Sequence, residues 1–136
     1  MDINGTQRFN AGPQQVWDAL HNSAMLQSCA PGGATIAWAN NNLVVTGTAP
    51  VINRTGTITI QVSDEQAPSH MRLSVNRGNV NATADLNLAP DGAGTNLTYT
   101  AHADLGGALG AAAMMAKPMA DSQLKQFFSC LASKVG

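Results

Sequence analysis

The chain offers few side chains that could act as nucleophiles or metal ligands, and its two cysteines are the most reactive of them. Cys29 lies in the stretch Leu-Gln-Ser-Cys-Ala-Pro-Gly-Gly, and Cys130 lies close to the other end of the sequence. A cysteine reacts or binds metal as a thiolate, which needs a base, a cation or a metal beside it. The sequence supplies none of these to Cys29, so we expect it to pack as a small apolar residue. Two cysteines also do not make a disulfide framework.

The three histidines are far apart in the sequence, at positions 21, 70 and 102, and are predicted on outward faces or in loops. A metal site needs His, Cys, Asp or Glu that converge, and a catalytic triad needs a similar convergence. No motif here indicates either. His21 follows Asp18 on the polar side of a predicted helix and is expected to be solvated. The glycine clusters match no dinucleotide or phosphate-binding loop. We therefore expect no catalytic residue, no metal and no cofactor.

Composition excludes further classes of function. Charged residues make up only 11% of the 136 residues and the net charge is -1, against about 25% charged residues in an average soluble domain. Such a chain lacks the basic surface that nucleic-acid binding requires. No apolar run approaches a membrane span, and the N-terminus has no secretory signal pattern. We expect a single domain over residues 1–136, located in the cytoplasm.

The elements that would position a site follow from the spacing of apolar residues. Residues 12–29 predict two short helices, the second beginning near Asn22 and ending before Pro31. Period-two alternation predicts antiparallel strands with one buried and one wet face. These expected strands, together with a short first one, span residues 6–11, 35–39, 43–52, 55–62, 71–77, 82–88 and 96–105.

From residue 107 the apolar period changes from two to 3.6, which predicts one long C-terminal helix. Its apolar stripe consists of Leu109, Ala113, Ala116, Ala120, Leu124, Phe127 and Leu131. The order of elements favours an α+β fold in which a sheet of six or seven strands wraps around this helix. Pro118 removes a helical hydrogen bond, so we expect a kink or break near Lys117, static rather than a hinge.

The first half of this helix is rich in Gly, Ala and Met, and small side chains over a curved sheet leave space. We therefore predict an apolar ligand pocket, although closer packing of an Ala-rich helix would also fit. Tyr99 would be an internal polar group, and Arg77 would either lie at the rim or extend into water. The predicted ligand-binding residues are Ile58, Ile60, Met71, Leu73, Arg77, Leu86, Tyr99, Leu109, Ala113, Met115 and Met119.

Four stretches in this order resemble one family. They are FNAGPQQVWDALHNSAMLQSCAPGG, GTAPVINRTGTITIQVSD, LAPDGAGTNLTYTAHADLGGALG and LKQFF. The chain resembles the CoxG-like family of carbon monoxide dehydrogenase proteins, within the START/polyketide cyclase (SRPBCC) superfamily. The resemblance implies a helix-grip fold with a hydrophobic cavity. It also implies a role beside a molybdenum hydroxylase and its membrane attachment, with a quinone or lipid-like molecule in the cavity and peripheral contact at the inner face of the membrane left open.

Three functions follow as hypotheses. The first is a non-enzymatic carrier of an apolar ligand, quinone or lipid-like, that serves a molybdenum hydroxylase complex. The second is a cyclase or aromatase, which would need polar side chains in the pocket. The third is an assembly factor that binds a protein partner and uses no ligand. The apolar character of the inward faces favours the first.

Overall fold

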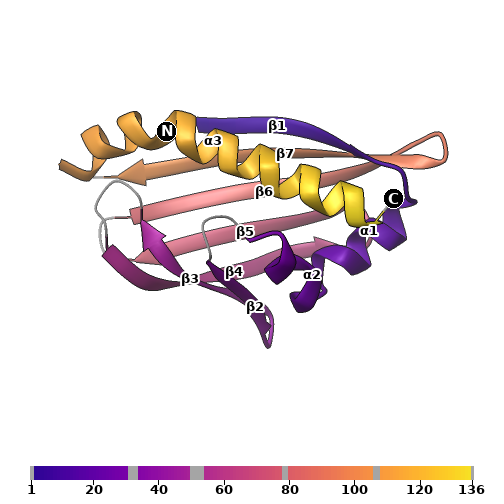
Figure 1. Cartoon of the computed structure of the whole chain (residues 1–136), viewed down its shortest axis with the longest axis horizontal. Helices are drawn as coiled ribbons and strands as arrows, with labels where there is room; N and C mark the ends of the chain where they lie inside the picture. Colours follow the sequence, from indigo (N-terminus) through magenta and orange to yellow (C-terminus); the bar gives the residue numbers. More distant parts are fainter. Residues whose placement is uncertain (1, 31–33, 50–53, 78–79, 106–107, 136) are drawn as a thin grey trace.

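The computed structural model describes the backbone of residues 2–30, 34–49, 54–77, 80–105 and 108–135, and the side chains of residues 2–30, 34–47, 57–76, 81–104 and 117–135. Within these ranges seven strands form one antiparallel sheet in the order β1-β7-β6-β5-β4-β3-β2 (Figure 1). The strands are β1 (Asp2–Phe9), β2 (Thr35–Ala39), β3 (Asn42–Ala49), β4 (Arg54–Gln66), β5 (His70–Arg77), β6 (Val80–Asp91) and β7 (Gly94–Leu105).

Two short helices follow the first strand, as the sequence predicts. Helix α1 (Pro13–Leu20) begins at a proline, which suits a first turn because the missing N–H would have no helical partner there. Helix α2 (Ser23–Ser28) is capped by Asn22, whose side-chain oxygen accepts a hydrogen bond from the Met25 N–H at 3.2 Å. The two helices lie at the end of the sheet near the C-terminus of the chain (Figure 1).

The C-terminal helix α3 (Ala108–Val135) continues through Pro118, so of the predicted kink or break near Lys117 the break does not occur. It lies over β1 and β7, at one side of the curled sheet (Figure 1). The concave face of the strands toward β2 is therefore not covered by α3 alone. The predicted α+β helix-grip architecture, a curled sheet with a long C-terminal helix and two short helices, is confirmed. No helix in the described ranges is long and apolar enough to cross a membrane.

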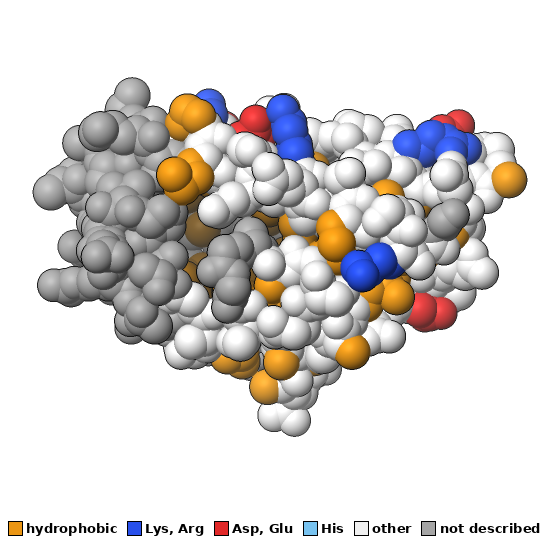
Figure 2. Space-filling model, in the orientation of Figure 1, with side chains coloured by type: hydrophobic (Ala, Val, Ile, Leu, Met, Phe, Trp, Pro, Cys, Tyr) orange, Lys and Arg blue, Asp and Glu red, His pale blue; other side chains and the backbone are white. Residues whose placement is uncertain are grey.

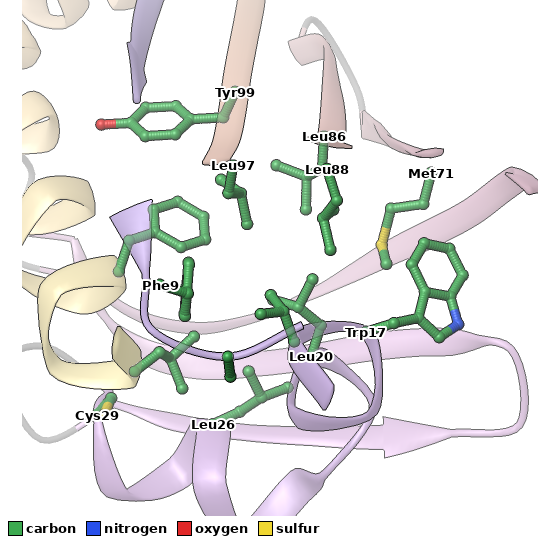
Figure 3. Packing of buried hydrophobic residues seen from close by; sticks show 14 of the residues in the cluster. Phe9, Trp17, Leu20, Leu26, Cys29, Met71, Leu86, Leu88, Leu97 and Tyr99 are labelled. Atoms are coloured by element: carbon green, nitrogen blue, oxygen red, sulfur yellow. The ribbon is translucent and has the colours of Figure 1, made fainter. Parts of the chain in front are cut away.

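One apolar core joins the sheet, α1, α2 and the second half of α3 (Figure 3). Its most deeply buried side chains include Phe9, Val16, Leu97 and Leu131. The fully buried Thr95 belongs to the same region and donates a hydrogen bond from Oγ1 to the Ala11 carbonyl at 2.7 Å. This bond satisfies a buried hydroxyl and ties β7 to the segment that leads into α1.

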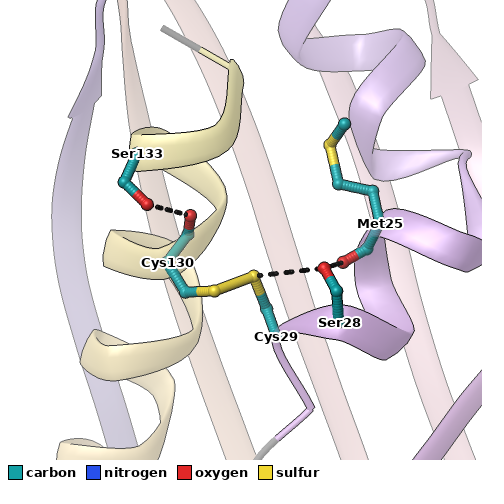
Figure 4. Close-up of a disulfide and its surroundings, with 5 residues drawn as sticks. All are labelled: Met25, Ser28, Cys29, Cys130 and Ser133. Atoms are coloured by element: carbon teal, nitrogen blue, oxygen red, sulfur yellow. Dashed lines mark hydrogen bonds between the residues drawn. A yellow bond between two sulfur atoms is a disulfide. The ribbon is translucent and has the colours of Figure 1, made fainter.

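Cys29 and Cys130 form a disulfide, with 5.7 Å between their Cα atoms (Figure 4). Two cysteines were expected to make no disulfide framework, so the sequence did not predict this bond. Cys29 does pack in the apolar core with 8% of its surface exposed, as predicted, but its sulfur is bonded to the last turns of α3. The pairing could not be predicted from the sequence, because the two cysteines are 101 residues apart and only the folded sheet brings the end of α2 against α3.

Candidate functional site

An apolar cavity of about 270 Å³ lies between the concave face of the sheet and the second half of α3. The ends of α1 and α2 close one side of it. The space-filling view shows a hollow beside the helix with hydrophobic side chains inside it (Figure 2). The described residues that line it are Leu20, Leu26, Ala34, Ile36, Trp38, Leu43, Val45, Ile60, Met71, Leu73, Leu86, Gln123, Leu124, Phe127 and Phe128.

The sheet forms one wall of the cavity, because the pleat of its strands turns every second side chain toward the concave face. Leu43 and Val45 alternate on β3, and Leu43 is opposite Ile60 on β4. Met71 on β5 is opposite Leu86 on β6. Since successive side chains of a strand point to opposite faces, each of these pairs places two apolar side chains, one from each strand, on the concave surface. From α3, residues four positions apart share a face and complete the opposite wall.

Four of the predicted ligand-binding residues meet in this wall. They are Ile60, Met71, Leu73 and Leu86. Ile58 and Met119 do not line the cavity and are 42% and 47% exposed. Arg77, Leu109, Ala113 and Met115 lie outside the residues whose side chains the structure describes, so their predicted role stays a prediction.

Tyr99 is buried in the core rather than placed in the cavity wall. Its ring stacks on Phe128 with 4.9 Å between ring centroids, and its hydroxyl has no hydrogen-bond partner within the described residues. The hydroxyl lies so near Gly5 that a Cβ at that position would be 2.3 Å from it. Burial raises the pKa of Tyr99, so the phenol stays protonated at neutral pH.

A stacked aromatic group, which no sequence pattern indicated, supports one end of the cavity. The His21 ring stacks on the Trp38 ring with 4.8 Å between ring centroids, and its centroid lies 4.9 Å from that of the Trp17 ring. His21 Nδ1 lies 2.8 Å from the Trp17 carbonyl oxygen, and Nε2 lies 3.0 Å from a carboxylate oxygen of Glu65. His21 is predicted as a solvated residue; its side chain is 29% exposed, and its ring also joins α1 to β2 and β4.

Trp38 is the cavity-lining member of this group, and its polar atoms are already bonded. Its Nε1–H donates to the Leu20 carbonyl at 3.0 Å, and its backbone N–H donates to Ser23 Oγ at 2.9 Å. Trp38 thus presents only its apolar ring to the cavity. The alternation of Ile36 and Trp38 on β2 was the signal that could have identified this wall.

A second depression, of about 150 Å³, continues along the concave face from the shared residues Ile60 and Leu73. The sheet is lined there largely by small side chains. They include Ala82, Ala84, Ala101 and Ala103. Part of the room that the sequence assigned to small residues of the helix therefore comes from alanines of β6 and β7.

Charged groups lie mainly outside the cavity. Arg72 Nε lies 3.0 Å from Asp85 Oδ1, and the hydrogen bond to Asp85 raises the pKa of Arg72. At the β1–β7 edge the exposed His102 bonds to Asp2, which raises the pKa of the imidazole and lowers that of the carboxyl. Within the described ranges no group of His, Cys, Asp or Glu is arranged to hold a metal ion.

The whole chain, residues 1–136, matches the model of one protein family, described as polyketide cyclase / dehydrase and lipid transport. The chain belongs to this family. No curated protein matches it. The family and the curled sheet around α3 agree with the SRPBCC-type assignment made from the sequence.

Solved structures show the same fold. A conserved protein from Geobacillus kaustophilus superposes with a TM-score of 0.82 at 24% identity, covering 99% of this chain and 95% of its own. A protein from Chromobacterium violaceum superposes with a TM-score of 0.75 at 15% identity, and the match covers 98% of this chain and 96% of that protein. A protein from Rhodobacter sphaeroides superposes with a TM-score of 0.73 at 21% identity, and the match covers 98% of this chain and 91% of that protein. At these identities the likeness concerns the fold alone.

Proposed function

We propose that the protein is a non-enzymatic carrier that binds an apolar molecule, quinone or lipid-like, in the cavity beside α3. The observation that carries the proposal is the lining of that cavity. Among its described residues one side chain, Gln123, is polar with a free hydrogen-bonding group, and the others are apolar or, like Trp38, have their polar atoms bonded elsewhere. Concave apolar sites with few polar groups are typical of small-molecule binding.

The same lining favours a carrier over a cyclase. General acid–base catalysis needs a titratable side chain within hydrogen-bond reach of the substrate. The described lining contains no Asp, Glu, His, Lys, Arg, Cys or Tyr. Tyr99, the residue on which a cyclase hypothesis would depend, is packed between Gly5 and Phe128.

The partner belongs to the same proposal. The resemblance of residues 9–33 and of the later segments to CoxG-like proteins supports an accessory to a carbon monoxide dehydrogenase-type molybdenum hydroxylase, with peripheral contact at the membrane. Co-purification with such a complex tests this part separately from ligand binding. If the complex is captured equally by a protein whose cavity is filled, the ligand-free assembly role replaces the carrier role.

Tryptophan fluorescence offers a direct test of ligand binding, because Trp38 lines the cavity and quinones quench indole emission. Titration with a short-chain benzoquinone should quench the wild-type protein saturably. Val45→Phe adds volume inside the cavity and should weaken binding at least tenfold. Val44→Phe is the matched control, since Val44 directly precedes Val45 in β3, points to the other face and does not line the cavity.

Native mass spectrometry with quinones and with long-chain alcohols complements the titration. The proposal is refuted if the wild-type protein binds neither class, or if the Val44 and Val45 variants bind equally well.

A further inference from the structure

We propose that the cavity selects an uncharged ligand that carries a carbonyl or hydroxyl oxygen, and that the Gln123 side-chain amide binds this oxygen. The inference rests on the proposed function, because it names the chemistry that the same cavity recognises. It assigns a residue that the sequence did not indicate.

Gln123 occupies a position on α3 where an apolar residue would be expected. Phe127 lies four residues further on, hence on the same face of the helix, and also lines the cavity. The polar residues Ser122 and Gln126 of the same helix segment are exposed to water, whereas Gln123 is half-buried. An amide has thus been placed in the apolar wall, not on the wet side of α3.

The amide of Gln123 makes no hydrogen bond within the described part of the chain. Water reaches this amide, since Tyr99 Oη is the one fully buried side-chain polar atom without a partner among the described residues. A ligand that displaces this water must bond to the amide or leave it unpaired, and an unpaired amide in an apolar setting costs free energy. Trp38 cannot donate a hydrogen bond to the ligand in place of Gln123, because its Nε1–H already donates to the Leu20 carbonyl at 3.0 Å. A ligand oxygen within reach of Gln123 Nε2 would accept the bond that the protein leaves open.

The charge of the cavity lining indicates whether the ligand oxygen is neutral or ionised. A carboxylate in this cavity would lose its hydration without gaining a counter-ion, since the described lining carries no cation. The nearest basic residue of α3 in sequence, Lys125, is exposed and pairs with Asp121 at 3.1 Å. The wall therefore suits a ketone, quinone or alcohol and disfavours an ionised fatty acid.

Three naphthalenes of similar shape separate these classes by isothermal titration calorimetry. 2-Acetylnaphthalene carries one neutral carbonyl, 2-ethylnaphthalene carries none, and 2-naphthoate is ionised at pH 8. The wild-type protein should bind the ketone more tightly than the hydrocarbon and the carboxylate least well. Gln123→Leu should weaken ketone binding about three- to tenfold, the usual range for one hydrogen bond, and should leave or improve hydrocarbon binding.

Two further variants control for structure. Gln126→Leu makes the same change at the exposed neighbouring position and should leave all three affinities unchanged. Gln123→Glu keeps the size of the side chain, adds a negative charge, and should weaken ketone binding at neutral pH even if Gln123→Leu does not fold.

The outcomes are distinguishable. If the wild-type protein binds none of the three compounds, the proposed function and this inference both fail. If it binds them but Gln123→Leu or Gln123→Glu lowers ketone and hydrocarbon affinity equally, or 2-naphthoate binds as tightly as the ketone, the carrier role stands and the assignment of Gln123 is overturned.

Discussion

The Cys29–Cys130 bridge should contribute a large part of the stability of this fold without determining ligand affinity. It joins residues 101 apart in sequence, and in the loop-entropy description a closed loop of that length stabilises the folded state by about 4.7 kcal/mol. Measured effects of disulfides are commonly about 2–4 kcal/mol. For a chain of 136 residues, an unfolding entropy of about 2.1 cal/mol/K per residue converts 1 kcal/mol to about 3–4 °C in Tm. Reduction should therefore lower Tm by roughly 7–16 °C.

Thermal and urea unfolding of the oxidised protein, with and without dithiothreitol, measures this effect. Intact-mass analysis establishes the starting redox state. The double variant Cys29→Ala/Cys130→Ala should melt near the reduced wild-type protein, and added reductant should not change its Tm. Affinity for the short-chain benzoquinone should stay within about twofold between the oxidised protein and the double variant, because neither cysteine lines the cavity.

The bridge has no such stabilising role if reduction leaves Tm unchanged in a protein whose mass shows the bridge present at the start. A protein purified without reductant that contains two free thiols would also contradict it. If affinity falls tenfold or more with the bridge absent, then the bridge positions α3 over the cavity, and its effects on stability and on binding are not separable.

Three further perturbations test the packing and the electrostatics. Tyr99→Phe removes a buried hydroxyl without a described partner, so chemical denaturation should show unchanged or slightly increased stability; a loss above about 1 kcal/mol would contradict this. Thr95→Val should lower the unfolding free energy by about 1–3 kcal/mol, because the Ala11 carbonyl loses its bond from a fully buried hydroxyl; equal stability would contradict it. The bond to Asp2 raises the pKa of His102, so its contribution is complete below the unfolded value of about 6.5 and is lost as pH rises through the folded value. The Tm difference between wild type and His102→Gln should accordingly be larger at pH 5.5 than at pH 9, and equal differences would refute the pairing.

Most of the fold could be predicted because its signals are local. Alternating apolar residues indicated the inward faces of Met71 and Leu73 on β5, and the change of period from residue 107 indicated α3. Each such signal depends on neighbours along one chain segment, and in a sheet with one buried face the pattern also restricts the register. The short helices were marked by Pro13 at the start of α1 and Asn22 before α2.

The site was harder to predict because it depends on how α3 lies across the sheet. Leu124 and Phe127 belong to the predicted apolar stripe of the helix, and both line the cavity as well as packing against the core. The helix lies over β1 and β7, which leaves the concave face between β3 and β6 open beside it. The spacing of apolar residues within α3 does not indicate that the helix lies over this side of the sheet. The disulfide and the His21 stack depend on the same tertiary arrangement and were missed for the same reason.

An apolar cavity of this size persists only if its walls resist collapse, since protein interiors otherwise pack closely. At one end the His21 ring lies against both tryptophans and bonds to Glu65, which ties α1 to β2 and β4. The disulfide ties the end of α2 to α3, so the helical wall opposite the sheet is also fixed. Both attachments join cavity walls through residues that, apart from Trp38, do not line the cavity. The cross-links therefore add to the stability of the folded walls from behind, while the apolar side chains and the Gln123 amide in front are left to contact a ligand.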